Sequence, residues 1–182
     1  MTIGTPGQIL ILLIAIAIGC YGVMMETLQE KQPRQTFRHS RFAKDKTPEE
    51  LFHRWFHGFT KDTFGMPLPK PTIVQEGDDN GVGTAVRKNP VGLIERVVAT
   101  TKEPPGHYSV EYVAVNGGFR HFFPVKEYTS RVTFTSDGKG TTIVWESEWI
   151  ALPLCGKIIS WMVHDALANH SMDFLITDGK EE

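Results

Sequence analysis

The sequence predicts an α+β fold in which a curved antiparallel sheet of about seven strands wraps around one long C-terminal helix. Three observations lead to this fold class. Segments with alternating apolar and polar residues recur between positions 35 and 151, and short turn sequences separate most of them. Apolar residues at helical spacing then follow from Gly156. Because strands joined by short turns pair in antiparallel fashion, the inner face of such a sheet must be buried against the helices.

Alternation and turn chemistry together set the expected strands. Glycine, proline, asparagine and aspartate cluster between them, at residues 78–81, 89–90, 104–106, 116–118 and 136–140. The expected strands cover residues 35–42, 72–76, 83–88, 91–102, 107–115, 126–136 and 140–151.

Two helical segments are expected beside these strands. Thr47 suits an N-cap, and Pro48-Glu49-Glu50 places a proline at the first helical position and acids in the first turn. This segment carries a broad apolar face and should end by Gly65, before a series of prolines. The final helix should run from Gly156 to about Thr177.

The N-terminal segment is the most apolar part of the chain. Residues 9–25 contain no charged side chain, and their length is at the short end of what spans a bilayer. The expected organisation is therefore a transmembrane anchor at residues 1–25 and a tether at 26–34. A globular domain at 35–177 and a tail at 178–182 follow.

Positive charge predicts which side of the membrane the domain occupies. Lysine and arginine are absent before the apolar run and frequent directly after it, at Lys31, Arg34, Arg38, Arg41, Lys44 and Lys46. The positive-inside rule then predicts a single-pass membrane protein with a cytoplasmic globular domain. The alternatives are a signal peptide, although residues 1–8 lack the usual positive charge, a lipoprotein signal ending at Cys20, and a buried helix.

Composition argues against several other functions. A formal net charge of -2 in 182 residues gives no basic face for nucleic acid. Cys20 and Cys155 lie too far apart in sequence for a metal or redox motif. His53 and His57 are spaced like two ligands on one helix face, but no third ligand is apparent, so no metal site is expected. Phosphate-loop and dinucleotide-binding glycine patterns are absent, and no cofactor is expected.

The order of elements and several local sequences resemble the START-like, or SRPBCC, superfamily of polyketide cyclases/dehydrases and lipid-transport proteins. The resemblance covers residues 35–177, and no single motif in it is diagnostic. It is carried by Gly81-Val82-Gly83, Ile94-Glu95-Arg96-Val97, residues 108–112, Gly140-Thr141-Thr142 and Trp145. It implies a helix-grip fold, with the sheet wrapped around the last helix and a hydrophobic ligand held between them.

Strand alternation predicts which side chains face that interior. In the last two strands, the charged residues belong in water, so the aromatic residues that alternate with them should point inward. Aromatic side chains with a polar tip can orient the one polar group of an apolar ligand. The expected ligand-binding residues are Val110, Tyr112, Phe134, Trp145, Trp149, Met162 and His170. Ordinary core packing is the alternative for each of them.

Glu95 and Arg96 are adjacent in an expected strand, so one of the two charges should face the inside of the sheet. A charge there needs a partner, water or a ligand group, unless a bulge or an edge ion pair removes it from the interior. In cyclase-like relatives an inward polar residue can act as an acid or base, so the resemblance makes Glu95, His170 and Tyr112 candidate catalytic residues.

The function predicted from the sequence is a membrane-anchored binding protein for a hydrophobic small molecule. The lipid, sterol or polyketide-like ligand would lie in an internal cavity. A cyclase/dehydrase-like enzyme and a protein-interaction module with a vestigial cavity are the alternatives. The loop at residues 119–124 contains three phenylalanines, which either pack under the last helix or contact the membrane.

Overall fold

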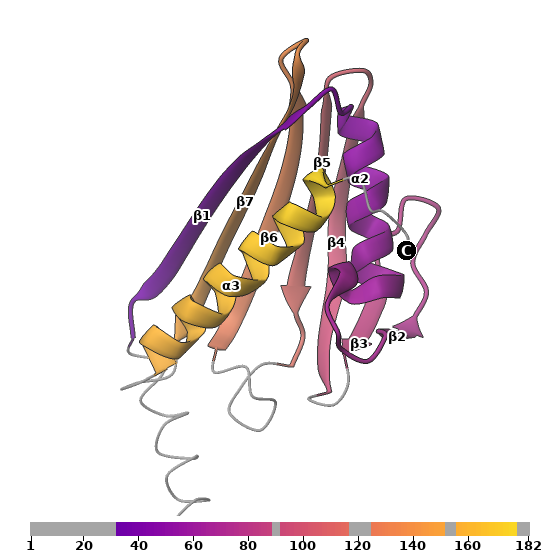
Figure 1. The fold of residues 1–182 in the computed structure, drawn as a ribbon. Coiled ribbons are helices and arrows are strands. Elements are labelled where there is room, and N and C mark those ends of the chain that lie inside the picture. The colour runs from indigo at the N-terminus through magenta and orange to yellow at the C-terminus, as the bar shows by residue number, and fades with distance from the viewer. Residues whose placement is uncertain (1–31, 89–91, 117–124, 152–155, 178–182) are drawn as a thin grey trace, which may run out of the picture.

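The computed structural model describes residues 32–88, 92–116, 125–151 and 156–177. The described elements are seven strands and two long helices, in the predicted order (Figure 1). The strand ends differ from the predicted ends by no more than two residues. They are β1 (Arg34–Lys44), β2 (Thr72–Gln75), β3 (Ala85–Lys88), β4 (Leu93–Glu103), β5 (His107–Ala114), β6 (Val125–Ser136) and β7 (Gly140–Ala151).

The strands form one antiparallel sheet in the order β1-β7-β6-β5-β4-β3-β2. Strands β2 to β7 follow one another as a meander, whereas β1 crosses to the far edge and pairs with β7. That pairing runs from Arg34 opposite Ile150 to Lys44 opposite Gly140. The start of the described chain therefore lies beside the end of β7, directly before the last helix.

The first helix, α2 (Pro48–His57), begins as its sequence predicts. The Thr47 side chain accepts a hydrogen bond from the Glu50 amide at 3.2 Å, and Pro48 occupies the first turn. The helix continues as a π-helix (Gly58–Asp62), and a turn with positive φ at each residue follows (Thr63–Gly65), so the right-handed helix ends before Gly65, as predicted.

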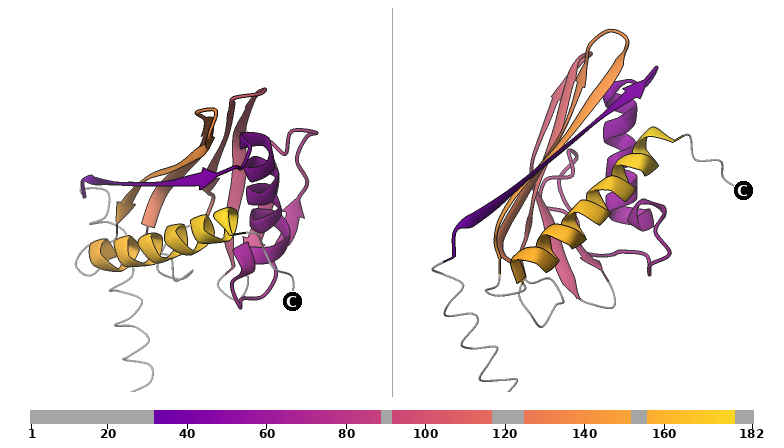
Figure 2. Two further views of the ribbon diagram at one scale, coloured as in Figure 1. Left: turned by 45° about the horizontal axis from the view of Figure 1, so that its top comes forward. Right: turned by 60° about the vertical axis from the view of Figure 1, so that its left-hand side comes forward.

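Both helices cover the same face of the sheet (Figures 1 and 2). Helix α2 packs on β5 and β6, and the last helix, α3 (Gly156–Ile176), packs on β1 and β7. Alternate side chains of the long strands point towards the helices and are buried, as in β7, where Ile143, Trp145, Ser147 and Trp149 are buried. This concave face contains the hydrophobic core.

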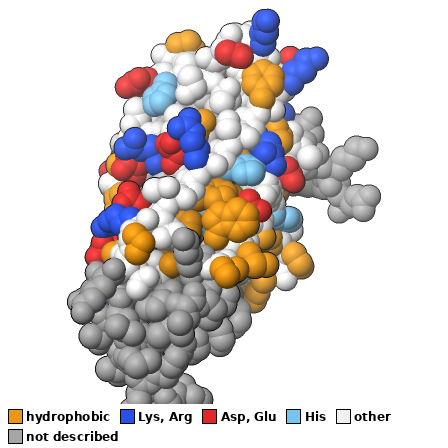
Figure 3. All heavy atoms as spheres, turned by 90° about the vertical axis from the view of Figure 1, so that its left-hand side faces the viewer, with side chains coloured by type: hydrophobic (Ala, Val, Ile, Leu, Met, Phe, Trp, Pro, Cys, Tyr) orange, Lys and Arg blue, Asp and Glu red, His pale blue; other side chains and the backbone are white. Residues whose placement is uncertain are grey.

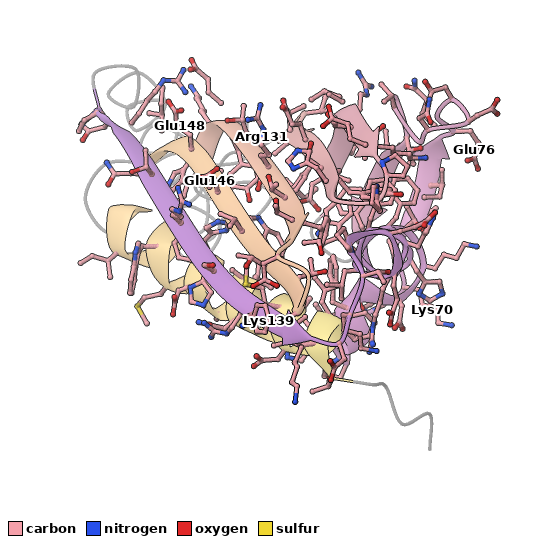
Figure 4. The ribbon with its side chains drawn as sticks, turned by 90° about the horizontal axis from the view of Figure 1, so that it is seen from above. Lys70, Glu76, Arg131, Lys139, Glu146 and Glu148 are labelled. Atoms are coloured by element: carbon pink, nitrogen blue, oxygen red, sulfur yellow. The ribbon has the colours of Figure 1, made fainter. Side chains whose placement is uncertain are left out.

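The opposite face of the sheet carries paired charges. Strand register places Glu111, Arg131, Glu146 and Arg38 in one row across β5, β6, β7 and β1. Arg131 pairs with Glu111, and Arg38 bonds Glu146 at 2.8 Å. Figure 4 shows Arg131, Glu146 and Glu148 on the side of the sheet away from α3. The prediction that the charged set of these strands faces water is confirmed.

Within the described ranges, no helix combines the length and hydropathy that crossing a bilayer requires. The apolar run at residues 9–25 lies outside those ranges, and so do Cys20, Cys155 and the loop at 119–124. The predictions that concern them stay predictions.

Candidate functional site

Beneath α3, the concave face of the sheet carries a continuous group of aromatic rings. Tyr112 lies 6.1 Å from Tyr128 and 6.4 Å from Trp145 between ring centroids, and Tyr128 lies 6.3 Å from Trp149. Each of these four side chains is at most 5% exposed. Phe64, which follows the π-helix, lies 6.3 Å from Trp145 and so joins this group to the aromatic side chains of α2.

His164 enters this group from α3. Its ring meets four aromatic rings edge-on, with centroid distances of 4.4 Å to Phe37, 5.2 Å to Trp149, 5.7 Å to Tyr128 and 6.4 Å to Trp145. The side chain is 4% exposed, and Nε2 has no hydrogen-bond partner among the described residues. Burial lowers the pKa of His164 to about 4, so the imidazole is neutral at pH 7.

A chain of hydroxyl groups lies on the sheet below the aromatic rings. Ser130 Oγ donates to the Glu146 carbonyl at 3.1 Å and accepts from Trp145 Nε1 at 2.7 Å. A serine hydroxyl has one hydrogen, so the 2.8 Å contact between Ser130 Oγ and Ser147 Oγ must have Ser147 as the donor. Ser147 in turn accepts from the Tyr128 hydroxyl at 3.3 Å. Ser130 therefore fixes the direction of every hydrogen bond in the chain.

Glu95 adds a carboxylate beside the tyrosines. Its side chain is 8% exposed, on the same face of β4 as Leu93 and Val97, so it is Glu95 rather than Arg96 that faces the helices. A bulge in the pairing of β4 with β5 lies directly after Val97. The sequence predicts that one of the two charges faces the interior without saying which, and in the structure it is Glu95; the bulge does not remove it from the interior.

The two tyrosines that face Glu95 are held as neutral phenols. Burial raises the pKa of Tyr112 well above 10, and the neighbouring Tyr128 and Glu95 raise it further. Burial likewise raises the pKa of Tyr128 to about 12; Ser147 opposes the rise, and Glu95 adds to it. Both phenols can act as hydrogen-bond donors at neutral pH, and neither can act as a base there.

The structure brings together most of the residues predicted to bind a ligand. Val110 and Phe134 are fully buried on the concave face, alongside Tyr112, Trp145 and Trp149. Met162 is 59% exposed on α3 and does not join them. His170 is also exposed, and its Nε2 lies 3.0 Å from the Phe64 carbonyl oxygen. The roles of Met162 and His170 in ligand binding stay predictions.

Of the three candidate catalytic residues, only Glu95 and Tyr112 lie close enough to influence each other electrostatically. Sequence reasoning gave no role to His164, Ser130 or Ser147. Strand alternation could have found the serines, since both share a face with large apolar residues. His164 could have been found from its helical spacing to Ala168, Met172 and Leu175, which are all buried.

The described residues contain no group of histidine, cysteine, aspartate and glutamate that could hold a metal ion. A hollow of about 550 Å³ lies against β1, β7, β6 and β5, lined by the paired row of charges with Glu148, Thr36, Thr129, Val98 and Val113, and also by Phe37, Tyr112, Ser130 and Ser147. An apolar ligand in this hollow would have to lie against the ion pairs of Arg131 with Glu111 and of Arg38 with Glu146, although part of the lining is apolar. We therefore take the aromatic group under α3, together with its hydroxyl chain, as the candidate site. This "α3 site" consists of Phe37, Glu95, Tyr112, Tyr128, Ser130, Trp145, Ser147, Trp149 and His164.

Comparison with known proteins gives matches at the level of structure only. No protein-family model matches the sequence, and no curated protein matches it significantly. Norcoclaurine synthase from Thalictrum flavum superposes with a TM-score of 0.64 at 16% identity, covering 85% of this chain and 91% of that one. The same enzyme in complex with dopamine and hydroxybenzaldehyde gives 0.60 at 17% identity, covering 81% and 87%.

Two further solved structures resemble the chain. Ara h 8.0201 superposes with a TM-score of 0.58 at 13% identity, covering 79% of this chain and 96% of that one. A protein from Nitrosospira multiformis gives 0.56 at 14% identity, covering 81% and 100%. Identities this low establish the fold and no more. The chain therefore has the fold of these solved structures, which is the helix-grip fold that its resemblance to the START-like, or SRPBCC, superfamily implies.

Proposed function

We propose that this protein binds a hydrophobic small molecule in the α3 site and is held at a membrane by its N-terminal segment. Among the candidate classes of lipid, sterol and polyketide-like molecule, the site favours a flat ring system with a hydroxyl or carbonyl group. Aromatic side chains stack on flat rings, and the Glu95 carboxylate disfavours an anionic headgroup.

The observation that carries the proposal is the imidazole Nε2 of His164, for which the described part of the chain offers no hydrogen-bond partner. A buried polar atom without a hydrogen bond costs about 1–3 kcal/mol, and a ligand that bonds to it recovers this free energy. Because the imidazole is neutral, one ring nitrogen can accept a hydrogen bond and the other can donate. A ligand hydroxyl or carbonyl can therefore bind at this point among the aromatic rings.

Ligand entry requires α3 to move away from the sheet, since the described aromatic rings contact one another beneath it. Beside His164 the inward side of α3 carries the small residues Ala168 and Ser171, and the larger Met172 and Leu175 are buried near its C-terminal end. The part of α3 that carries His164 therefore has less buried side-chain volume to displace than α2, which inserts Phe52 and Trp55 into the core. Apolar surface removed from water then stabilises the complex at roughly 25 cal/mol per Å².

For membrane attachment, we infer a single span at residues 9–25 with the domain on the cytoplasmic side. The support is the uncharged run and the lysines and arginines that follow it. In this arrangement the ligand would be exchanged with the bilayer next to the domain.

Extraction of the purified full chain, followed by mass spectrometry of the bound molecules, tests the proposed ligand. We expect a ring-containing molecule with one or two polar groups to co-purify. Replacing Ala168, which is fully buried on α3, by leucine should fill the site and remove the molecule, whereas Ala166→Leu on the exposed side should retain it. Equal recovery from both variants would place the ligand elsewhere.

A second function is favoured by one specific observation, the carboxylate of Glu95 beside two neutral phenols. A cyclase/dehydrase-like enzyme would use Glu95 to accept a proton and Tyr112 to donate one. Turnover of an added polyketide substrate, abolished by Glu95→Gln, would support this function. A third possibility, an interaction module with a vestigial cavity, is favoured by the close ring packing and would be supported by a protein that co-purifies without any ligand.

A further inference from the structure

The first turns of α3 expose a stripe of large apolar side chains. Ile158, Trp161 and Met162 are 64%, 53% and 59% exposed. Their spacing of three and four residues places them on one side of the helix. Figure 3 shows exposed hydrophobic side chains gathered on the face of the molecule that carries β1 and α3. We call Ile158, Trp161 and Met162 the α3 stripe.

The α3 stripe lies at the same end of the domain as the start of β1, the strand that follows the tether. Arg34, the first residue of β1, pairs with Ile150 near the end of β7, and α3 starts shortly after β7. Both views in Figure 2 show the start of β1 and the start of α3 at the same end of the sheet. The predicted span ends at Met25, and residues 26–33 can extend over at most about 28 Å. A span at residues 9–25 therefore holds this end of the domain close to the bilayer.

The composition of the stripe matches a bilayer interface. Tryptophan is enriched at the level of the lipid headgroups, and isoleucine and methionine favour the acyl region beneath them. Beyond the stripe the exposed side of α3 changes character, with Asn169, His170 and Asp173 at the following turns. The apolar surface is thus confined to the end of the helix that lies nearest the tether.

We propose that the α3 stripe inserts into the interface of the bilayer to which the chain is tethered. This inference rests on the proposed membrane attachment and extends it, because it fixes how the domain is oriented. The same segment of α3 carries His164 on its inner side, above the α3 site. An apolar ligand can then pass between site and bilayer at this helix with little exposure to water.

Quenching of tryptophan emission by brominated lipid tests the proposal directly. The chain contains four tryptophans, and Trp161 is 53% exposed, whereas Trp55, Trp145 and Trp149 are at most 5% exposed. The full chain is reconstituted into phosphatidylcholine–phosphatidylglycerol vesicles with or without dibromo-phosphatidylcholine. We expect lower emission in the brominated vesicles, and we expect Trp161→Phe to lose most of that quenching.

Replacing the rest of the stripe provides a second variant with a matched control. Ile158→Ser combined with Met162→Ser should also reduce quenching, because Trp161 then lies higher in the interface. Phe42→Ser removes a side chain that is 47% exposed near the opposite end of β1 and should leave quenching unchanged. Circular dichroism melting of each variant confirms that it is folded.

Flotation of the same vesicles tests membrane attachment separately from insertion of the α3 stripe. The stripe proposal rests on that attachment. Protein that fails to float with the vesicles contradicts the membrane attachment and the stripe contact together. Protein that floats while Trp161 is not quenched contradicts the stripe contact alone. Blue-shifted Trp161 emission without quenching would also overturn it, because the stripe would then be covered by residues 1–31 or by a second copy of the chain.

Discussion

The imidazole of His164 is surrounded by four aromatic rings, and this environment makes the free energy of unfolding depend on pH through His164. Its pKa of about 4 in the folded protein lies below the 6.5 of an unfolded chain. Above pH 6.5 both states are neutral at this residue. As pH falls from 6.5 towards 4, only the unfolded state gains the proton, so the free energy of unfolding decreases.

We predict that between pH 7 and pH 4 the wild-type protein loses up to about 3 kcal/mol more stability than a His164→Phe variant. Urea unfolding of both proteins at a series of pH values measures the difference. Comparing the two proteins at each pH isolates the contribution of His164. His53→Phe replaces a histidine whose side chain is 64% exposed and should follow the wild type. Parallel losses in wild type and His164→Phe would show that His164 is hydrated in the folded protein.

Ser130 controls the hydroxyl chain under the aromatic rings. Ser130→Ala leaves the indole N–H of Trp145 buried without an acceptor and removes the acceptor of Ser147. We predict a decrease of about 1–3 kcal/mol in the free energy of unfolding, measured by chemical denaturation. Ser40→Ala, at an exposed position of β1, should change it by less than about 0.5 kcal/mol. A loss for Ser130→Ala no larger than for Ser40→Ala would contradict the assigned hydrogen bonds.

At the scale of elements, the junction between α2 and the π-helix depends on the close approach of two segments. Gly58 has a backbone conformation that any residue can adopt, with φ of -59°. A Cβ atom at this position would lie 2.5 Å from the Phe64 ring, which is 2% exposed and packs on Trp145. The glycine is therefore required by packing, because it lets the Phe64 ring reach the edge of the α3 site.

We predict that Gly58→Ala destabilises the protein by about 1–3 kcal/mol, because the Phe64 ring must move. Thermal unfolding measures the loss. Gly106→Ala is the matched control, since no atom lies within 4 Å of a Cβ at that turn. An unchanged melting temperature for Gly58→Ala would show that the ring of Phe64 can shift freely.

Sequence reasoning succeeded where local chemistry determines the element. Thr47-Pro48-Glu49-Glu50 contains the signals of a helix start, and the sequences between β4 and β7 contain turn signals, so these boundaries were predicted to within two residues. It could not predict the placement of β1, because pairing with β7 joins residues about 100 positions apart. The π-helix was also missed, since nothing local distinguishes it from an ordinary helix end.

The α3 site was predicted only in part, because strand alternation is a local signal and the orientation of α3 is not. Alternation placed Tyr112, Trp145 and Trp149 inside, and the structure agrees. Which side of α3 faces the sheet depends on packing along the whole helix. For this reason the sequence predicts Met162 among the inward residues, whereas in the structure Met162 is exposed and His164 enters the aromatic group.

At the scale of the whole molecule, charge and apolar surface are divided between the faces. The row of paired charges occupies the outer face of the sheet, while the aromatic group and its hydroxyls are enclosed between the sheet and α3. This division leaves the α3 site as the place where an apolar molecule with one polar group is best accommodated.

The central claim is that the polar group of a ring-shaped ligand bonds to His164 within the α3 site. Calorimetric titration with 2-naphthol and with naphthalene, using the full chain and His164→Phe, tests it most directly. The account predicts that the wild-type protein binds 2-naphthol about tenfold more tightly than the variant does, a difference of roughly 1.4 kcal/mol. Naphthalene should bind both proteins alike, because it has no group to bond to the imidazole. Equal affinities of the two proteins for 2-naphthol, or no binding of either compound, would contradict the claim.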